Sequence, residues 1–178
     1  GLGMVHQHFS LAGNLSVLDN IILGTQPIWD FRLQRKEAAD RIMDLGSRFG
    51  LEVDPNLRVA ELSMGERQRV EILKALYRNA SILILDEPTA VLTPQESRTL
   101  FKTLRQLLND GLSIIFISHK LAEVLEVCDR IAVLRDGKLV MEENVSKTSE
   151  KMLAKAMVGR PFKMPIRKET TVGESLLA

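Results

Sequence analysis

Two adjacent carboxylates, Asp86 and Glu87, directly follow the apolar run Ile82–Leu85. A continuous apolar run of this length indicates a strand buried on both faces of a sheet. In open parallel sheets, ligands bind at the carboxyl ends of the strands. One carboxylate placed there can hold the water shell of Mg²⁺, and the other can orient or deprotonate an attacking water. The pair therefore suits metal-assisted phosphate chemistry, and the simpler alternative is a solvated acidic turn before Pro88.

A second candidate site is Leu62–Glu66, where a helix is predicted to begin. Ser63, followed three residues later by Glu66, forms the sequence of a capping box. A helix start presents unpaired backbone N–H groups and roughly half a positive charge, so it favours an anion such as a phosphate. Taken alone, these residues fit an ordinary capped helix better. The carboxylates just downstream favour the phosphate interpretation.

The third candidate is His119, which directly follows the apolar run Ser113–Ser118. A histidine at the carboxyl end of a strand can reach a terminal phosphate and respond to its loss. A lone histidine in that position is more often a plain surface residue. His6 and His8 flank Gln7, but no third ligand lies near them in the sequence, so we do not expect a metal pair there.

The elements that must position these residues alternate between strand and helix. Apolar runs predict strands at Leu2–Val5, Ile82–Leu85, Ser113–Ser118 and Arg130–Arg135. Asp136-Gly137 is the sequence of a tight hairpin turn, so Lys138–Glu142 is predicted to return antiparallel to the last of these strands. Helices are predicted at Asn14–Gly24, Gln34–Phe49, Ser63–Asn79, Pro94–Asn109, Lys120–Cys128 and Thr148–Val158. The alternation predicts an α/β fold with a mainly parallel sheet.

Composition narrows the class of protein. The 178 residues are enough for one domain, and a net charge of +1 gives no reason to expect nucleic acid or anionic lipid as a partner. Cys128 is the only cysteine, which excludes a disulfide or a cysteine zinc site within the chain. Apolar runs such as Ile114–Ile117 are far shorter than the ~20 residues that span a bilayer. The first residues lack the features of a signal peptide. A membrane connection would therefore come through a partner.

Four segments together resemble the ABC ATPase family. In order and spacing, Gln7 is similar to its Q-loop, Leu62–Arg69 to its signature motif, Ile82–Thr89 to its Walker B strand, and His119 to its switch histidine. The resemblance extends through Gly159. It implies a P-loop NTPase-like α/β fold with a mainly parallel sheet and an inserted α-helical subdomain.

The resemblance also implies a domain organisation. Residues 1–159 would be a partial ABC ATP-binding domain whose N-terminal part is missing, with the helical subdomain at about 10–80. Residues 160–178, which contain Pro161 and Pro165, would be a linker to a second ATP-binding domain. Glu174–Ala178 would then begin the first strand of that domain, so the chain is expected to be truncated at both ends.

Roles follow residue by residue from the resemblance. Asp86 would support Mg²⁺, Glu87 would be the catalytic base, and His119 would contact the γ-phosphate of ATP. Gln7 would join Asp86 at the Mg²⁺–ATP site and couple it to the transport partner. A second ATP-binding half, arranged head to tail, would hold another ATP molecule, and the signature of this half would bind it. Ser63 and Gly65 would contact its γ-phosphate. The binding residues of the signature would be Leu62, Ser63, Met64, Gly65 and Glu66.

Three departures from the family pattern matter. The phosphate-binding loop G-x-x-x-x-G-K-[ST] is absent from these residues. We therefore expect the 178 residues alone to bind ATP poorly and to hydrolyse essentially none. Met64 and Glu66 stand where the commonest signature has Gly and Gln, but Ser63 and Gly65 are kept, so the motif is expected to function. Thr93 stands where the family usually has an aspartate that connects the two ATP sites. The resemblance therefore does not imply that this connection is kept.

The detailed sequence of three further segments narrows the resemblance to one branch of the family. The segments 3–9, 70–78 and 89–96 look like the first half of tandem ATPases that energise bacterial importers of nucleosides or simple sugars. The nucleoside branch, associated with basic membrane proteins, is the closer match. Implied partners are the second ATP-binding half, transmembrane permease subunits and, indirectly, a substrate-binding lipoprotein, but no nucleic acid. The implied location is the cytoplasmic face of a bacterial cell membrane.

The leading prediction is thus an ATP-hydrolysing importer subunit for nucleosides, and an importer of a ribose-like or galactose-like sugar is the first alternative. A non-transport ABC ATPase in DNA maintenance would need a long heptad arm or a cysteine zinc module, and one acting on ribosomes would need a basic insertion. Neither feature is in these residues. A purely structural ABC-like domain would be expected to lose Glu87 or His119, and both are present.

Overall fold

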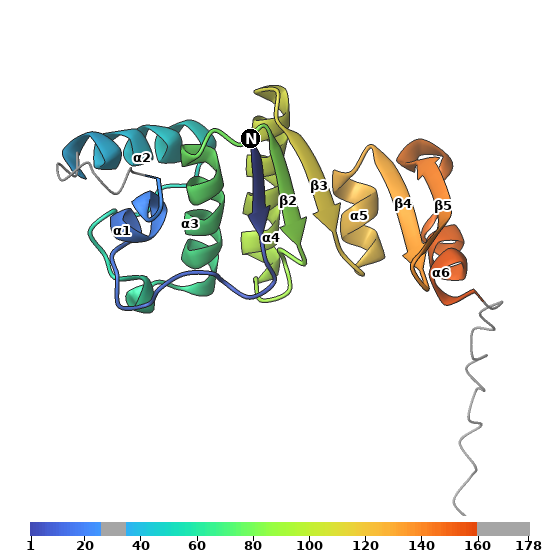
Figure 1. Cartoon of the computed structure of the whole chain (residues 1–178). Coiled ribbons are helices and arrows are strands. Elements are labelled where there is room, and N and C mark those ends of the chain that lie inside the picture. The colour runs from blue at the N-terminus through green and yellow to red at the C-terminus, as the bar shows by residue number, and fades with distance from the viewer. Residues whose placement is uncertain (26–34, 160–178) are drawn as a thin grey trace, which may run out of the picture. The chain divides into compact units, whose positions relative to one another are not determined.

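The computed structural model describes residues 1–25 and 35–159, and the chain divides into two compact units, Gly1–Val127 and Cys128–Ala178. The first unit contains β1 (Leu2–Val5), α1 (Val17–Ile22), α2 (Arg35–Phe49), α3 (Met64–Tyr77), β2 (Ile82–Asp86), α4 (Pro94–Asn109), β3 (Ser113–Ile117) and α5 (Leu121–Val127) (Figure 1). The second contains β4 (Arg130–Arg135), β5 (Lys138–Asn144) and α6 (Glu150–Val158). The predicted alternation of strands and helices is confirmed. The predicted linker at 160–178 lies outside the described residues.

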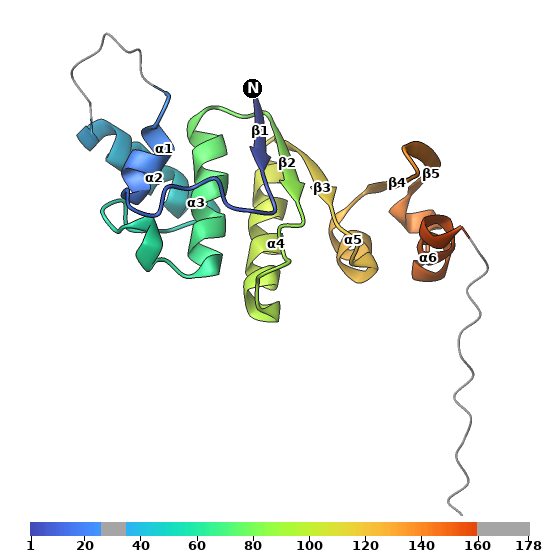
Figure 2. The same cartoon turned by 60° about the horizontal axis from the view of Figure 1, so that its bottom comes forward.

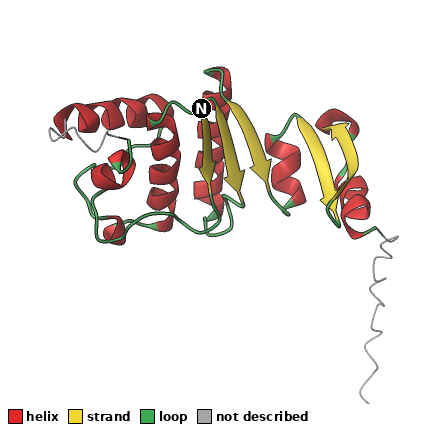
Figure 3. Ribbon diagram, viewed as in Figure 1, coloured by secondary structure: helices red, strands yellow, loops and turns green. Residues whose placement is uncertain are grey.

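The three strands of the first unit form a parallel sheet in the order β1-β2-β3 (Figure 3). Leu85 of the central strand lies opposite Val5 on one side and Phe116 on the other. All three strands run in the same direction, as the arrowheads in Figure 1 show, and the register places their last residues within one position of each other. The residues that follow the strands therefore meet at one edge of the sheet.

One expectation about this sheet is wrong, because β2 is not buried on both of its faces. Leu83 and Leu85 are fully buried, but Ile82, on the opposite face, is 37% exposed. On the same face of β3, Ile115 is 51% exposed. Among the described residues, the helices cover only the face that carries Leu83. The apolar run correctly predicted a strand, but whether its second face is covered depends on other elements.

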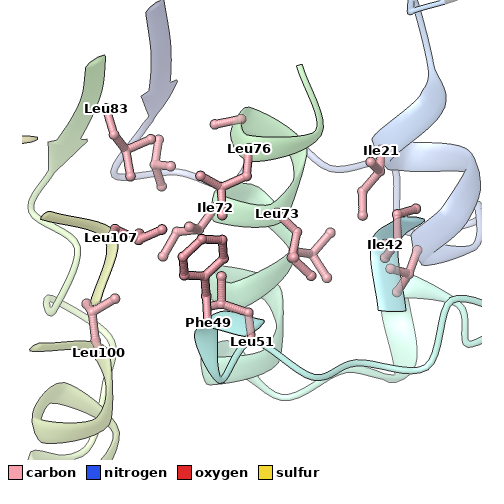
Figure 4. Packing of buried hydrophobic residues seen from close by; sticks show 14 of the residues in the cluster. Ile21, Ile42, Phe49, Leu51, Ile72, Leu73, Leu76, Leu83, Leu100 and Leu107 are labelled. Atoms are coloured by element: carbon pink, nitrogen blue, oxygen red, sulfur yellow. The ribbon is translucent and has the colours of Figure 1, made fainter. Parts of the chain in front are cut away.

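A single core joins the helices α1–α3 to the covered face of the sheet (Figure 4). Ile21 of α1 and Ile42 of α2 pack on one side of α3, and Leu83 of β2 lies on its other side. Helix α3 therefore lies between the N-terminal helices and the sheet. Its own contributions to the core are Val70, Ile72, Leu73, Ala75 and Leu76.

Helix boundaries follow the capping chemistry of the sequence. Ser16 caps α1 by accepting a hydrogen bond from the Asp19 backbone N–H. Helix α2 ends at Gly50, whose φ of +65° belongs to the left-handed region that glycine adopts without strain. Figure 2, turned by 60° from the first view, shows α1 and α2 lying beside α3.

In the residues that the structure describes, the second unit is a hairpin followed by one α-helix. The turn residues Asp136 and Gly137 have φ values of +51° and +72°, as a tight two-residue hairpin turn requires. The antiparallel return to β5 is confirmed, and it continues to Asn144 rather than ending at Glu142. Leu153 of α6 is buried, and Arg135 donates a hydrogen bond to the Ala156 carbonyl at 2.8 Å. In the part of the chain that the structure describes, no helix has the length and apolar character that a bilayer crossing requires.

The loop after β1 is held by a buried asparagine. Asn20 is 2% exposed; its side-chain oxygen accepts the Ala12 N–H at 2.7 Å, and its amide donates to the carbonyls of Ala12 and Ser16. These bonds fix the backbone that leads from Gln7 into α1. Nothing in the spacing of the sequence indicated this contact.

We expect Asn20→Ala to lower the free energy of unfolding by about 1–3 kcal/mol, because it leaves buried backbone groups without partners. Urea denaturation measures the change. The control is Asn56→Ala, which removes an exposed amide that bonds only to Asp54 nearby and should change stability by less than about 0.5 kcal/mol. Equal effects of the two substitutions would contradict the assignment.

Candidate functional site

The candidate site lies at the edge where β1, β2 and β3 end. Gln7 follows β1, Asp86 ends β2 and Glu87 follows it, and His119 lies two residues beyond β3. The structure thus places the residues predicted from three separate segments at the carboxyl edge of one sheet. Their proximity follows from the parallel register, since each strand contributes the residues just beyond its end.

Glu87 and His119 make direct contact. The His119 ring Nδ1 lies 2.7 Å from Glu87 Oε1, and the His119 backbone N–H donates to the same oxygen at 3.0 Å. The Glu87 backbone N–H donates to the Ile117 carbonyl at 2.9 Å. Glu87 adopts a left-handed φ of +48°, which is uncommon for a residue with a side chain. The carboxylate is thereby turned away from the line of β2 and held against the end of β3.

The two side chains differ in exposure. The Glu87 side chain is 15% exposed and the His119 side chain 71%. The second ring nitrogen of His119 is therefore accessible to a ligand from solvent. The pair combines a sheltered carboxylate with an exposed imidazole, an arrangement suited to placing a proton acceptor beside a group that contacts the ligand.

The second oxygen of the Glu87 carboxylate is the site's main unsatisfied group. Glu87 Oε2 is buried and accepts no hydrogen bond from the described residues. A buried acceptor without a partner costs about 1–3 kcal/mol. Because the surrounding protein shields Oε2 from solvent, a water reaches this oxygen only when the Glu87 side chain or its neighbours shift. A carboxylate with one oxygen held by protein and the other without a partner fits the predicted role of a base.

Asp86 is the last residue of β2 and lies opposite Ile117 of β3. Residues 1–25 and 35–159 contain no cluster of three or more His, Cys, Asp or Glu side chains that could hold a metal ion. Mg²⁺ bound with a nucleotide keeps several waters and takes only one or two carboxylates beside the phosphate oxygens. Asp86 has the chemistry and the position for such a single ligand.

A polar cluster that the sequence did not indicate supports this edge. Thr89 is fully buried, and its hydroxyl donates to Glu123 Oε2 at 2.5 Å. Lys120 donates from Nζ to the Thr89 carbonyl at 3.0 Å and forms an ion pair with Glu123 at 3.2 Å. The loop after Glu87 is thus tied to the start of α5. The only signal for it was the i, i+3 pairing of Lys120 and Glu123 directly after His119.

The capping box predicted for the signature segment is confirmed at the start of α3. The Ser63 backbone N–H and hydroxyl each donate to Glu66 Oε2 at 2.8 Å, and the Glu66 N–H donates to Ser63 Oγ at 3.3 Å. The intervening N–H groups of Met64 and Gly65 have no partner within the helix, because they belong to its first turn. Leu62 is buried and anchors this start. The segment therefore offers two backbone amides to an anion, while the Ser63 hydroxyl is bonded to Glu66.

Gln7 and the signature segment, far apart in the sequence, line the same groove. This groove has a volume of about 430 Å³, and Gln7, Phe9, Met64, Arg67 and Val91 are among its lining residues. The backbone near Gln7 is tied to α3, since the Ser10 N–H donates to the buried Glu71 carboxylate at 2.5 Å and Lys74 donates to the Ser10 carbonyl at 3.1 Å. Sequence reasoning placed Gln7 at the sheet edge but missed its connection to α3.

A parallel sheet with a carboxylate–histidine pair at its carboxyl edge, beside a helix start suited to anions, defines an α/β domain for a phosphate-bearing ligand. A sequence model described as "ABC transporter" matches residues 1–90, and the chain belongs to that family. The predicted ABC ATPase fold is confirmed by two solved structures. An inward-facing ABC transporter of the metal-chelate type aligns with a TM-score of 0.76 and 21% identity over 89% of this chain and 64% of that one, which supports the fold alone.

The second structure, cbiO1 from Clostridium perfringens, part of the ABC transporter complex cbiONQ, aligns with a TM-score of 0.68 and 28% identity over 88% of this chain and 61% of that one. Among curated relatives, the nucleoside import ATP-binding protein NupA of Lactococcus lactis is 48% identical over 90% of this chain and 32% of that protein. The glucose import ATP-binding protein TsgD13 of Haloferax volcanii is 43% identical over 99% of this chain and 38% of that protein. The chain spans about a third of the length of these relatives.

The capping box makes stability depend on pH. Hydrogen bonds from the Ser63 backbone N–H and then its hydroxyl hold the pKa of Glu66 below its ordinary value of 4.5. A lowered folded pKa stabilises the protein above the unfolded pKa, and this contribution is lost as the pH falls through the folded pKa.

We expect Glu66→Gln to lower the free energy of unfolding at pH 7 by about 0.3–1 kcal/mol, since a carboxylate at a helix start contributes that much. The difference from the unaltered protein should shrink below about pH 4.5. Urea titrations between pH 3 and pH 7 measure it, and the exposed Glu52→Gln serves as control. A difference that stays constant with pH would show that the charge of Glu66 does not contribute.

Proposed function

We propose that this chain is part of the ATP-binding subunit of an ABC importer and that Glu87 and His119 belong to its hydrolytic site. The observation that carries the proposal is the Glu87 carboxylate, which has one oxygen held by His119 and the other buried without a partner. The relatives support it, because several are import ATP-binding proteins that share between 41% and 48% of aligned residues with this chain.

Each residue at the sheet edge would contribute one step. The free oxygen of Glu87 accepts a hydrogen bond from the attacking water and then its proton, while His119 keeps the carboxylate oriented. The exposed nitrogen of His119 reaches the terminal phosphate. Asp86 holds the water shell of Mg²⁺, and the bound ion supplies charge neutralisation on the phosphates. His119 thus holds one oxygen of the Glu87 carboxylate before ATP arrives, which lowers the cost of reorganisation.

The signature segment would serve a different ATP molecule. The Ser63 hydroxyl and the N–H groups of Met64 and Gly65 would bind the terminal phosphate of ATP held by a second ATP-binding half arranged head to tail. The hydroxyl donates to Glu66 in the present structure, so it must turn from that carboxylate toward the phosphate. Leu62 and Glu66 would hold the backbone of the segment in place.

Partners follow from the same proposal. Permease subunits would contact the helical segment at about 10–80, with Gln7 transmitting the state of the ATP site through the groove that it shares with Met64 and Arg67. The subunit would lie on the cytoplasmic face of the membrane, and a substrate-binding lipoprotein would take part indirectly. The linker at 160–178 would connect this half to the second one within the whole protein.

We expect Glu87→Gln in the full-length protein to reduce ATP hydrolysis at this site by about 100-fold or more, with ATP binding retained, because the base is lost but the shape is not. The base of the second half must be disabled in all samples, so that its turnover does not mask the loss. Glu37→Gln, which alters an exposed carboxylate in α2, is the matched control. Undiminished hydrolysis with Glu87→Gln would refute the role of Glu87 as the base.

For the substrate, we propose a nucleoside. Two relatives with nucleoside or guanosine import in their names are 48% and 47% identical to this chain, whereas the relatives named for glucose or ribose import are between 39% and 46% identical. A simple sugar is the alternative that these matches also support. A non-transport ABC ATPase is a third possibility, and it predicts no association with a permease.

The expected result of an uptake experiment is ATP-dependent import of labelled guanosine, but not of labelled ribose, by vesicles containing the full-length protein and the permease subunits encoded beside it. Unlabelled guanosine in excess should compete. Import of ribose alone would favour the sugar alternative. No import, together with failure of the protein to associate with the permease, would favour a function outside transport.

A further inference from the structure

The starts of α3 and α4 touch at a glycine and a carboxylate. A Cβ added to Gly65 would lie 3.0 Å from Cδ of Glu96 and 3.4 Å from its Cγ, with Oε1 closer still. Real side chains do not approach so closely, so any other residue at position 65 would have to displace the Glu96 carboxylate, the far end of a flexible side chain, from the position that it holds here. The two residues belong to different helices and are separated by the whole of α3 and β2.

Glu96 is held in this position by its own capping box. The Thr93 backbone N–H and hydroxyl each donate to Glu96 Oε2 at 2.8 Å, and the Glu96 N–H donates to Thr93 Oγ1 at 3.3 Å. These bonds occupy Oε2 and leave Oε1 directed at Gly65. Thr93 stands where the ABC ATPase family usually has an aspartate, and in this chain it orients the carboxylate of Glu96, three residues later.

Arg69 connects this carboxylate to the signature segment electrostatically. Bonds from Thr93 lower the pKa of Glu96, and the positive charge of Arg69 adds to the effect. The same arginine lies 3.9 Å from Glu66, the carboxylate that caps α3. Gly65, Gln68, Arg69 and Glu96 line one small hollow of about 190 Å³ between the two helices. The two capping boxes therefore form one polar contact region across the helix starts.

We propose that Glu96 is a positioning residue for the signature segment: locked by Thr93, it sets how closely the start of α3 approaches α4. This separation fixes the direction of the N–H groups of Met64 and Gly65, the groups that would bind phosphate. The segment from Glu87 to Thr93 thereby links the hydrolytic site to the signature within one chain. The inference rests on the proposed function, since it assigns Glu96 to the same phosphate-binding segment.

The steric part of the proposal is tested without ATP. Gly65→Ala should lower the midpoint of urea denaturation of the full-length protein, and it should lower it by less than half as much when Glu96→Ala is already present, because that truncation removes the atoms that an added methyl group meets. If the shift of the double variant equals the sum of the two single shifts, the contact does not exist in solution and the proposal is overturned.

The positioning part is tested on ATP. Glu96→Ala should raise the ATP concentration for half-maximal hydrolysis about tenfold or more, with a smaller effect on the maximal rate, because binding by the signature is weakened while Glu87 is intact. Glu96→Gln, which keeps the shape of the side chain, should restore most of the affinity. Glu37→Ala removes a first-turn carboxylate from α2 and is the control, expected to leave the half-saturating concentration unchanged.

The outcomes distinguish a positioning role of Glu96 from a purely structural contact with Gly65. An unchanged half-saturating concentration in Glu96→Ala, alongside confirmed coupling with Gly65, would make the contact purely structural and overturn the positioning role. A Glu37→Ala effect as large as that of Glu96→Ala would overturn it as well. If the unaltered full-length protein neither binds nor hydrolyses ATP, the proposed function itself fails, a result that the urea experiment does not depend on.

Discussion

Parallel pairing of β1, β2 and β3 in register is the constraint on which the site depends. The side chains of Glu87 and His119, 32 positions apart in the sequence, have no local reason to meet. They come together because three strands run in the same direction and end at the same level. The contact between Glu87 and His119 then needs only a short backbone turn, which the left-handed conformation of Glu87 supplies. The backbone strain at that residue is balanced by its bonds to Ile117 and His119.

Buried polar side chains connect the ends of the strands to the helices around the sheet. Thr89 ties the loop after β2 to α5, Glu71 ties the segment after Gln7 to α3, and Asn20 closes the same segment onto α1. Thr89 and Glu71 bond to groups far from them in the sequence, whereas Asn20 bonds to the segment just before it, and all three side chains are at least nine-tenths buried. The bond from the Ser10 N–H to Glu71, in the middle of α3, is a directional contact that restricts this helix relative to the segment after β1. The starts of α3 and α4, joined at Gly65 and Glu96, extend the same restriction to the signature segment.

Much of this arrangement was predictable from the sequence. The edge formed by Asp86, Glu87 and His119 follows from apolar runs and from the rule that ligands bind at the carboxyl ends of parallel strands. The capping box of Ser63 and Glu66 is local, so three residues of spacing were enough to predict it. Helix ends such as Gly50 and Gly159 follow from glycine's access to positive φ. In each case, the information lies within a few residues of the feature.

What could not be predicted involves contacts between distant segments. No pattern in the sequence indicates that Glu123 bonds to Thr89, that Glu71 accepts from Ser10, or that Glu96 lies against Gly65. The burial of β2 was predicted wrongly for a related reason, since the apolar character of Ile82 does not reveal whether an element covers it. The direction of the Glu87 carboxylate depends on its positive φ, which is uncommon for glutamate and carries no sequence signal.

The central claim is that the buried, unpaired oxygen of Glu87 receives the attacking water. It is tested most directly by a structure of the full-length protein with Mg²⁺, ADP and vanadate, in which an apical vanadate oxygen marks the position of that water. The account predicts that Glu87 Oε2 lies within hydrogen-bonding distance of this oxygen, about 3 Å, while Oε1 keeps its bond to His119. A Glu87 side chain that points away from the vanadate, or whose Oε2 is bonded to another protein group, would contradict it.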